Sequence, residues 1–278
     1  MLANIDWSQI RVIAWKELRD RLRNRWVLAV AAIFALFALA IAYFGAAQQG
    51  EVGFRNIDVT VASLVSLVIY LVPLIALILG YDAVVGEQER GSLELLLSMP
   101  VTRFELLLGK YLGLAAALAS ATAIGFGAGV LPLANQLTLH DGYHYVGFVI
   151  SAILMGMAFL SISILVSTIA TDRVRASGAA VALWFFFVLI FDLLLMGILI
   201  VTQGKVTSAV FAATLMFNPA DVFRLLNIFN SQQVQGMYGL ATVMPENLTN
   251  PLVLFCIMLA WIFVPFGIGC WRFNCKRH

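Results

Sequence analysis

Long apolar runs separated by short polar stretches dominate this sequence. A helix needs about 20 apolar residues to cross a hydrocarbon core of roughly 30 Å. Six runs reach that length, and we predict a membrane-spanning helix at each of them: residues 26–44, 59–81, 111–133, 145–170, 178–201 and 252–271. The pattern therefore predicts an all-α, polytopic membrane protein in which residues 1–278 form a single transmembrane domain.

The composition supports lipid as the solvent for most of the chain. Hydrophobic residues make up 62% of the sequence, charged residues 12%, and the mean hydropathy is +0.95. A soluble protein carries about a quarter charged residues, so this chain has too few to coat a surface that faces water. The net charge is only +2, and basic residues cluster only within the first 25 residues, which argues against nucleic acid as a partner.

The distribution of Lys and Arg predicts the orientation, because cytoplasmic loops carry an excess of these residues. Of the 17 basic residues, 14 lie in the N-terminal segment, the second and fourth connections and the C-terminus. Only Arg55, Lys205 and Arg224 lie elsewhere. We therefore expect both termini in the cytoplasm, a cytoplasmic region at residues 82–110 and an extracytoplasmic loop at residues 202–251.

The segment before the first span, residues 1–25, is predicted to be an interfacial helix. Its apolar residues recur at helical spacing and form one stripe: Trp7, Ile10, Ala14, Leu18 and Leu22. Arg11 interrupts the stripe, and the other face is mostly charged. Such a helix would bury its stripe near membrane lipid and place its Arg residues against anionic headgroups. A helix that is merely solvated in the cytoplasm is the alternative.

Residues 82–110 contain the most distinctive local pattern. Gly86 and Gly91 flank an acidic cluster, and a short helix with leucines on one face follows. Pro100 is expected to end that helix, and Thr102 with Glu105 forms the capping box of the next one. A short rigid helix of this kind suits docking to a cytoplasmic partner. An ordinary amphipathic loop fits the residues equally well.

The expected loop at residues 202–251 also contains structure. Asn218-Pro219 begins a helix, with Asn as the cap and Pro at the first position. Its apolar face consists of Val222, Leu225, Leu226 and Phe229. Residues 206–217 are apolar but too short to span, which suggests an interfacial or re-entrant helix. Either the spans of the chain itself or a partner must cover these apolar faces.

Three further features have more than one interpretation. Asp192 is an acid deep inside a predicted span, so it either lines a polar transport path or is a protonated structural acid. His140 and His144 are four residues apart and would bind copper on one helix face, although Gly142 argues against a helix there. We therefore assign no metal site. Gly125 and Gly129 form a small-residue pair that lets another helix approach closely.

Residues 86–100, GEQERGSLELLLSMP, closely resemble the G-E-x-E-R-G-[ST]-L-E-x-L-L-[ST]-x-P motif of ABC transporter permeases of the type-2 exporter group. The six spans, the N-terminal helix and the long last outer loop agree with that group over the whole chain. Within it, the sequence is most similar to the permease subunit of the nitrous oxide reductase maturation transporter, the NosY family.

The resemblance implies a complex in the bacterial inner membrane. Two copies of the permease would pair with two cytoplasmic ABC ATPase subunits, which hold ATP and Mg²⁺, and with a periplasmic repeat (β-helix) protein. The complex would help to assemble the copper–sulfur centre of nitrous oxide reductase. Its coupling region would contact the ATPase through Gly86, Glu87, Glu89, Arg90, Gly91, Leu93, Glu94, Leu97 and Pro100. The helix that begins at Asn218 would contact the periplasmic protein.

The chain itself is expected to be non-catalytic and to hold no cofactor. A phosphate-binding loop needs the pattern G-x-x-x-x-G-K-[ST]. Gly109-Lys110 is followed by Tyr111, and residue 104 is Phe. The predicted function is to couple ATP hydrolysis in a partner to export or to mechanical transmission across the membrane. A general type-2 exporter of a lipid or small molecule and a non-transporting membrane anchor or receptor are the alternatives.

Overall fold

The computed structural model describes residues 6–44, 57–131, 139–203, 207–228 and 250–275. Within these ranges six helices are long and apolar enough to cross a membrane, which confirms the predicted number of spans. They are α2 (Trp26–Phe44), α3 (Ile57–Gly80), α6 (Arg103–Val130), α7 (Leu139–Ile169), a bent fifth span and α13 (Pro251–Cys275). The fifth span consists of α8 (Arg173–Phe185), the π-helical segment η3 (Phe186–Ile190) and α9 (Phe191–Val201).

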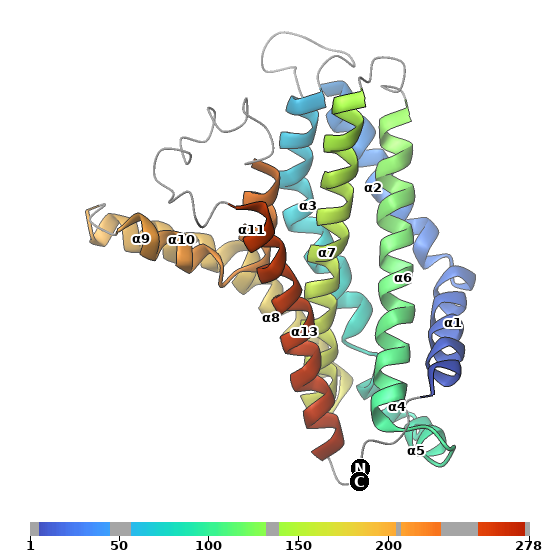
Figure 1. Cartoon of the computed structure of the whole chain (residues 1–278). Coiled ribbons are helices and arrows are strands. Elements are labelled where there is room, and N and C mark those ends of the chain that lie inside the picture. The colour runs from blue at the N-terminus through green and yellow to red at the C-terminus, as the bar shows by residue number, and fades with distance from the viewer. Residues whose placement is uncertain (1–5, 45–56, 132–138, 204–206, 229–249, 276–278) are drawn as a thin grey trace.

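Shorter helices gather at the end of the bundle where α13 ends and α6 begins (Figure 1). These are α1 (Trp7–Arg23), α4 (Val85–Glu89) and α5 (Ser92–Leu97). The basic N-terminal segment and both basic connections therefore share one end of the molecule, which the charge distribution predicts to face the cytoplasm.

Small residues on α6 allow α2 to pack closely against it. A Cβ atom added to Gly125 would lie 2.5 Å from the Cβ of Phe34, and one added to Gly129 would collide with Ala38. Phe34 also stacks on Phe126, with ring centroids 4.9 Å apart. The close helix approach predicted from this glycine pair is confirmed.

The helix α1 also packs on α6, through a face that includes only part of the predicted stripe. Ile10 is buried, and Gly109 and Gly113 of α6 leave room for the α1 backbone and for Ile13. Trp7 keeps 68% of its surface exposed, and Leu22 is also exposed. Ile10 of the predicted stripe therefore faces α6, whereas Trp7 and Leu22 point away from it. Burial of the stripe in membrane lipid stays a prediction.

The last two short helices are α10 (Ser208–Leu215) and α11 (Pro219–Ile228). In Figure 1, α10 extends outward from the side of the bundle, and α11 lies against the bundle rather than beyond its end. The helix α11 packs against α3, α7 and α13. This position favours the re-entrant interpretation of the apolar stretch before Asn218.

Candidate functional site

The predicted coupling region folds into two short helices joined by a tight turn. Gly91, at φ +69°, forms the turn between α4 and α5. This left-handed conformation is costly for residues with a Cβ atom, which explains the glycine. After α5, the predicted capping box is present, since Thr102 accepts a hydrogen bond from the Glu105 backbone and Glu105 accepts one from Thr102. The local prediction for this region is confirmed.

Gly86 is required by close approach rather than by backbone conformation. A Cβ atom at this position would collide with the Asp82 carboxylate and lie 2.8 Å from Nη2 of Arg173. The backbone oxygen of Gly86 also accepts a hydrogen bond from Arg173, at 3.4 Å. Gly86 therefore allows two charged side chains to cross the surface of α4.

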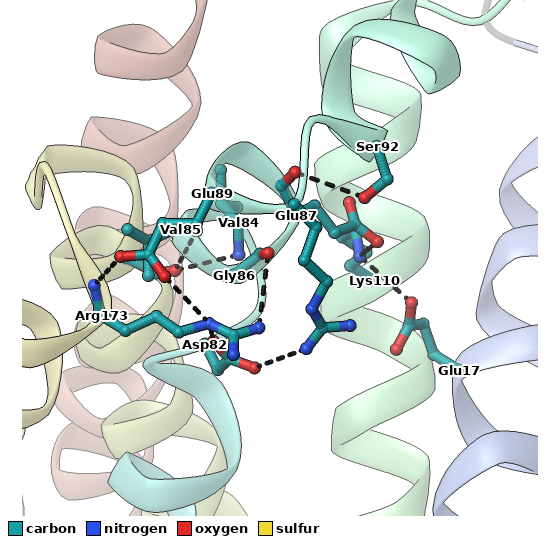
Figure 2. A network of polar contacts seen from close by, with 12 residues as sticks. Glu17, Asp82, Val84, Val85, Gly86, Glu87, Glu89, Ser92, Lys110 and Arg173 are labelled. Carbon is teal, nitrogen blue, oxygen red and sulfur yellow. Dashed lines mark hydrogen bonds and ion pairs between the residues drawn. The ribbon is translucent and has the colours of Figure 1, made fainter.

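On one side of α4, a buried lysine joins three helices. Lys110 Nζ of α6 lies 2.6 Å from Glu87 Oε1 of α4 and 3.1 Å from Glu17 Oε1 of α1 (Figure 2). The Lys110 side chain is only 4% exposed. Burial of Glu17 disfavours its charged form, but the attraction of Lys110, with smaller contributions from Lys16 and Arg21, holds the pKa of Glu17 below its ordinary value.

On the other side of α4, Arg173 at the start of α8 forms a second charge network (Figure 2). Its Nε lies 2.8 Å from Asp82 Oδ1 and 3.4 Å from Glu89 Oε2. The Arg173 backbone N–H also donates to Glu89, at 2.7 Å. Arg90 lies 3.5 Å from Asp82, but its own side chain is 63% exposed.

A serine of α7 completes the attachment of α4. Ser167 Oγ accepts hydrogen bonds from the backbone N–H groups of Val84 and Val85, at 2.9 and 3.1 Å. Helix N-termini leave such donors without partners inside the helix, so Ser167 satisfies groups that would otherwise be buried and unpaired. The helices α6, α7 and α8 therefore hold this five-residue helix directly, and α1 is joined to it through Lys110.

The predicted coupling residues divide into two sets. Gly86 and Leu93 are buried and Glu87 is nearly so, and Leu97 is half-buried. The exposed set consists of Glu89, Arg90, Gly91, Glu94 and Pro100. Only the exposed set is available to a partner, and Leu95, 68% exposed, joins it.

Four residues that organise this site were not among those predicted: Glu17, Asp82, Lys110 and Arg173. The sequence contains a pattern that could have identified Glu17. Glu17 stands in helical register with Ile10, Ile13 and Ala14, so an acid occupies the packed face of α1 and needs a cation.

The structure places most of the residues predicted for the periplasmic partner inside the protein. Asn218, Pro219, Val222 and Leu225 are buried, Leu226 is half-buried, and Phe229 lies outside the described residues. These side chains pack against the bundle, so the spans themselves supply the cover that their apolar face needs. Contact with a partner stays a prediction, and it would require other residues of the loop.

Asp192 forms an ion pair that the sequence did not suggest. Its Oδ2 lies 2.9 Å from Nη2 of Arg224, whose Nη1 lies 2.7 Å from Asp221 Oδ1. Burial raises the pKa of Asp221 to about 7, although Arg224 opposes the shift. These three residues belong to the lining of an otherwise mostly apolar pocket of about 220 Å³ between α9, α10 and α11. A role for Asp192 in a transport path stays a prediction.

The weak metal candidates lie on a helix after all. His140 and His144 both belong to α7. The expectation that Gly142 would prevent a helix here is therefore wrong. The side chain of His140 lies outside the described part of the chain. Among the side chains that are described, no group of three or more His, Cys, Asp or Glu residues is arranged to hold a metal ion.

Comparison with known proteins gives the family. Residues 11–277 match the family described as ABC-2 family transporter protein. A Pseudomonas aeruginosa relative named "Probable ABC transporter permease protein NosY" is 46% identical over 239 residues, which cover 84% of this chain and 87% of the relative. A Stutzerimonas stutzeri relative of the same name is 40% identical over 264 residues, covering 92% of this chain and 95% of the relative. The chain therefore belongs to the ABC-2 transporter family and is the transmembrane permease subunit of an ABC transporter, a complex in which ATPase subunits are its partners.

Proposed function

We propose that α4 and α5 form the coupling region through which the ATPase subunits drive this permease. The observation that carries the proposal is the pair of charge networks on either side of α4, one centred on Lys110 and one on Arg173. The ion pairs of Lys110 are buried and therefore costly to break, and Arg173 adds partly exposed pairs on the other side. A force on α4 therefore moves the helices paired with it rather than α4 alone. The exposed side chains of α5 offer the ATPase a surface at which to apply that force.

The likeness to the two NosY relatives supports a more specific proposal. Two copies of the chain, in a bacterial inner membrane with both termini in the cytoplasm, pair with two ATPase subunits and a periplasmic repeat protein. ATP and Mg²⁺ bind to the ATPase. The complex serves assembly of the copper–sulfur centre of nitrous oxide reductase, either by moving a small solute outward or by transmitting motion to the periplasmic protein.

The test separates docking from transmission in cells that express the whole complex. Glu94→Ala with Leu95→Ala alters only exposed side chains, so it should reduce the ATPase that co-purifies with the permease about tenfold. Glu87→Gln should leave the ATPase bound, yet reduce loading of the reductase copper centre, measured by its absorption spectrum, about tenfold. Arg175→Ala is the matched control, because Arg175 is exposed on α8 and pairs only locally with Asp172 and Thr171.

Two results would contradict these proposals separately. Full ATPase recovery and full copper loading in the double variant would exclude the α5 surface as the docking site. Full copper loading in a strain without the permease would exclude the reductase as its client and leave the coupling region unaffected.

A further inference from the structure

The fifth span is the least buried of the six within the described part of the chain. Only 17% of its most apolar stretch is buried, against 28–61% for the others. Within α9, Leu195 is the one buried residue. The outer half of this span is therefore held by few apolar contacts within the chain.

The bend in this span lies at η3, where the helix widens for five residues. A π-helical turn interrupts the regular backbone hydrogen bonds of an α-helix and leaves backbone groups that need other partners. Asn218 supplies one, since its Nδ2 donates to the Phe187 carbonyl at 2.8 Å. Asn218 is only 1% exposed and also bonds to Asp221 and to the backbone N–H of Ala220, so its side chain is fixed.

The same short helix holds the far side of the bend. Arg224, two turns along α11 from Asn218, is fixed by Asp221 and reaches Asp192 in the first turn of α9. The helix α11 and its cap residue Asn218 thus contact the fifth span within the π-helical turn, at Phe187, and just after it, at Asp192. Because α11 itself packs against α3, α7 and α13, it ties the bend to the bundle.

Space next to the bend allows α9 to move. The pocket of about 220 Å³ separates parts of α9 and α10 from α11, and apolar side chains such as Met196, Leu199 and Phe211 line it. The pocket is open to the surface, so α9 can change its angle towards it without displacing a close-packed core.

We propose that the fifth span is a lever with its hinge at η3, and that α11 locks the lever in its bent position through Asn218 and Arg224. One arm, α8, begins at Arg173 in the coupling region, and the other arm is α9. Motion of α4 turns α8, and opening of the Asp192–Arg224 pair lets α9 swing. The hinge and its lock stand on the geometry alone, whereas the drive through α4 rests on the proposed function.

The lever is tested by a distance measured between spin labels in the full-length permease, co-purified with its ATPase and placed in lipid nanodiscs. Ile200→Cys in α9 and Leu252→Cys in α13 carry the labels, since both positions are well exposed. The three native cysteines are replaced first, and labelled chains are diluted with unlabelled ones. Asp192→Asn and Asn218→Ala are compared with Arg175→Gln, a control at an exposed ion pair on the other arm.

Without nucleotide, the lock predicts one narrow distance for the wild type and the control. Each lock variant should add a second distance that accounts for at least about a fifth of the signal. Asp192→Asn keeps the shape of the side chain, so it still tests the lock if Asn218→Ala fails to fold. A single wild-type distance in Asp192→Asn would overturn the lock.

Trapping the ATPase with ATP and vanadate tests whether motion of the ATPase reaches the fifth span through α4 and α8. The second distance should then arise in the wild type as well. If the lock variants show it and the trapped wild type does not, the hinge stands and transmission from the ATPase through α4 and α8 is refuted.

Discussion

Replacement of Lys110 by methionine should loosen α4 and destabilise the end of the bundle that contains α1, α4 and α5. Lys110 lies 2.6 Å from Glu87 and 3.1 Å from Glu17, with 4% of its side chain exposed. At an effective dielectric constant of about 20, these distances correspond to gross attractions of about 6 and 5 kcal/mol. The desolvation of all three groups offsets much of this attraction.

The net effect of Lys110→Met is therefore set by the two carboxylates left without their cation. Removal of one partner from a buried ion pair costs about 3–5 kcal/mol. Glu17 keeps a weaker contact with the exposed Lys16 at 3.6 Å, which places the expected cost at the lower end of that range. For a chain of this size, about 3 kcal/mol corresponds to a fall of roughly 10 °C in the melting temperature.

The assay is thermal unfolding of the purified permease in detergent. The informative comparison is a neutral triple variant, Lys110→Met with Glu17→Gln and Glu87→Gln. Because the triple variant leaves no unpaired charge, it should regain most of the stability lost in Lys110→Met. Loading of the reductase copper centre should stay impaired, since the link between α4, α6 and α1 is still absent. A melting temperature for Lys110→Met within about 2 °C of the wild type would refute the buried-ion-pair argument. So would a triple variant no more stable than Lys110→Met.

Four further outcomes follow from the same region. The pKa of Glu17 is lowered in the folded protein, so its pairing with Lys110 contributes its full stabilisation of the fold above about pH 4.5. The melting temperature should therefore fall as the pH drops below that value. This pH dependence should be weaker in Lys110→Met. Gly91→Ala should lower stability by about 1–2 kcal/mol through backbone strain alone, since its Cβ would meet no atom within 4 Å. Gly86→Ala should impair coupling more than Gly91→Ala in the copper-loading assay, because its Cβ forces apart the ion pairs beside α4. Thr102→Ala should cost about 0.5–2 kcal/mol in the unfolding assay by removing the cap of α6.

Much of the fold was predictable because its determinants are local. The length of each apolar run defines a span, and glycine and the capping box define the turns around α5. The bend at η3 had no such signal, since no proline interrupts Phe186–Ile190. It depends on Asn218, which lies 31 residues from Phe187 in the chain.

The candidate site shows the same division. The motif from Gly86 to Pro100 identified the segment but not what holds it, because Lys110 and Glu17 are 93 residues apart. In the sequence, Lys110 is one of the 14 basic residues that predict the orientation of the chain in the membrane, and nothing there marks it as the partner of Glu17. Arg173 looked similar, and only the fold brings it to Asp82 and Glu89.

The attachment of α1 to α6 has a consequence for the order of events during synthesis. Glu17 meets Lys110 93 residues later in the chain, and the backbone N–H of Asp6 bonds to Glu105, 99 residues later. At translation rates of about 5–20 residues per second, α1 waits roughly 5–20 s before its partners on α6 are made. Trp7 and Trp15, exposed in the finished protein, suit binding of α1 to the lipid surface during this interval. The membrane surface would thus hold the first helix of the chain until the third span arrives.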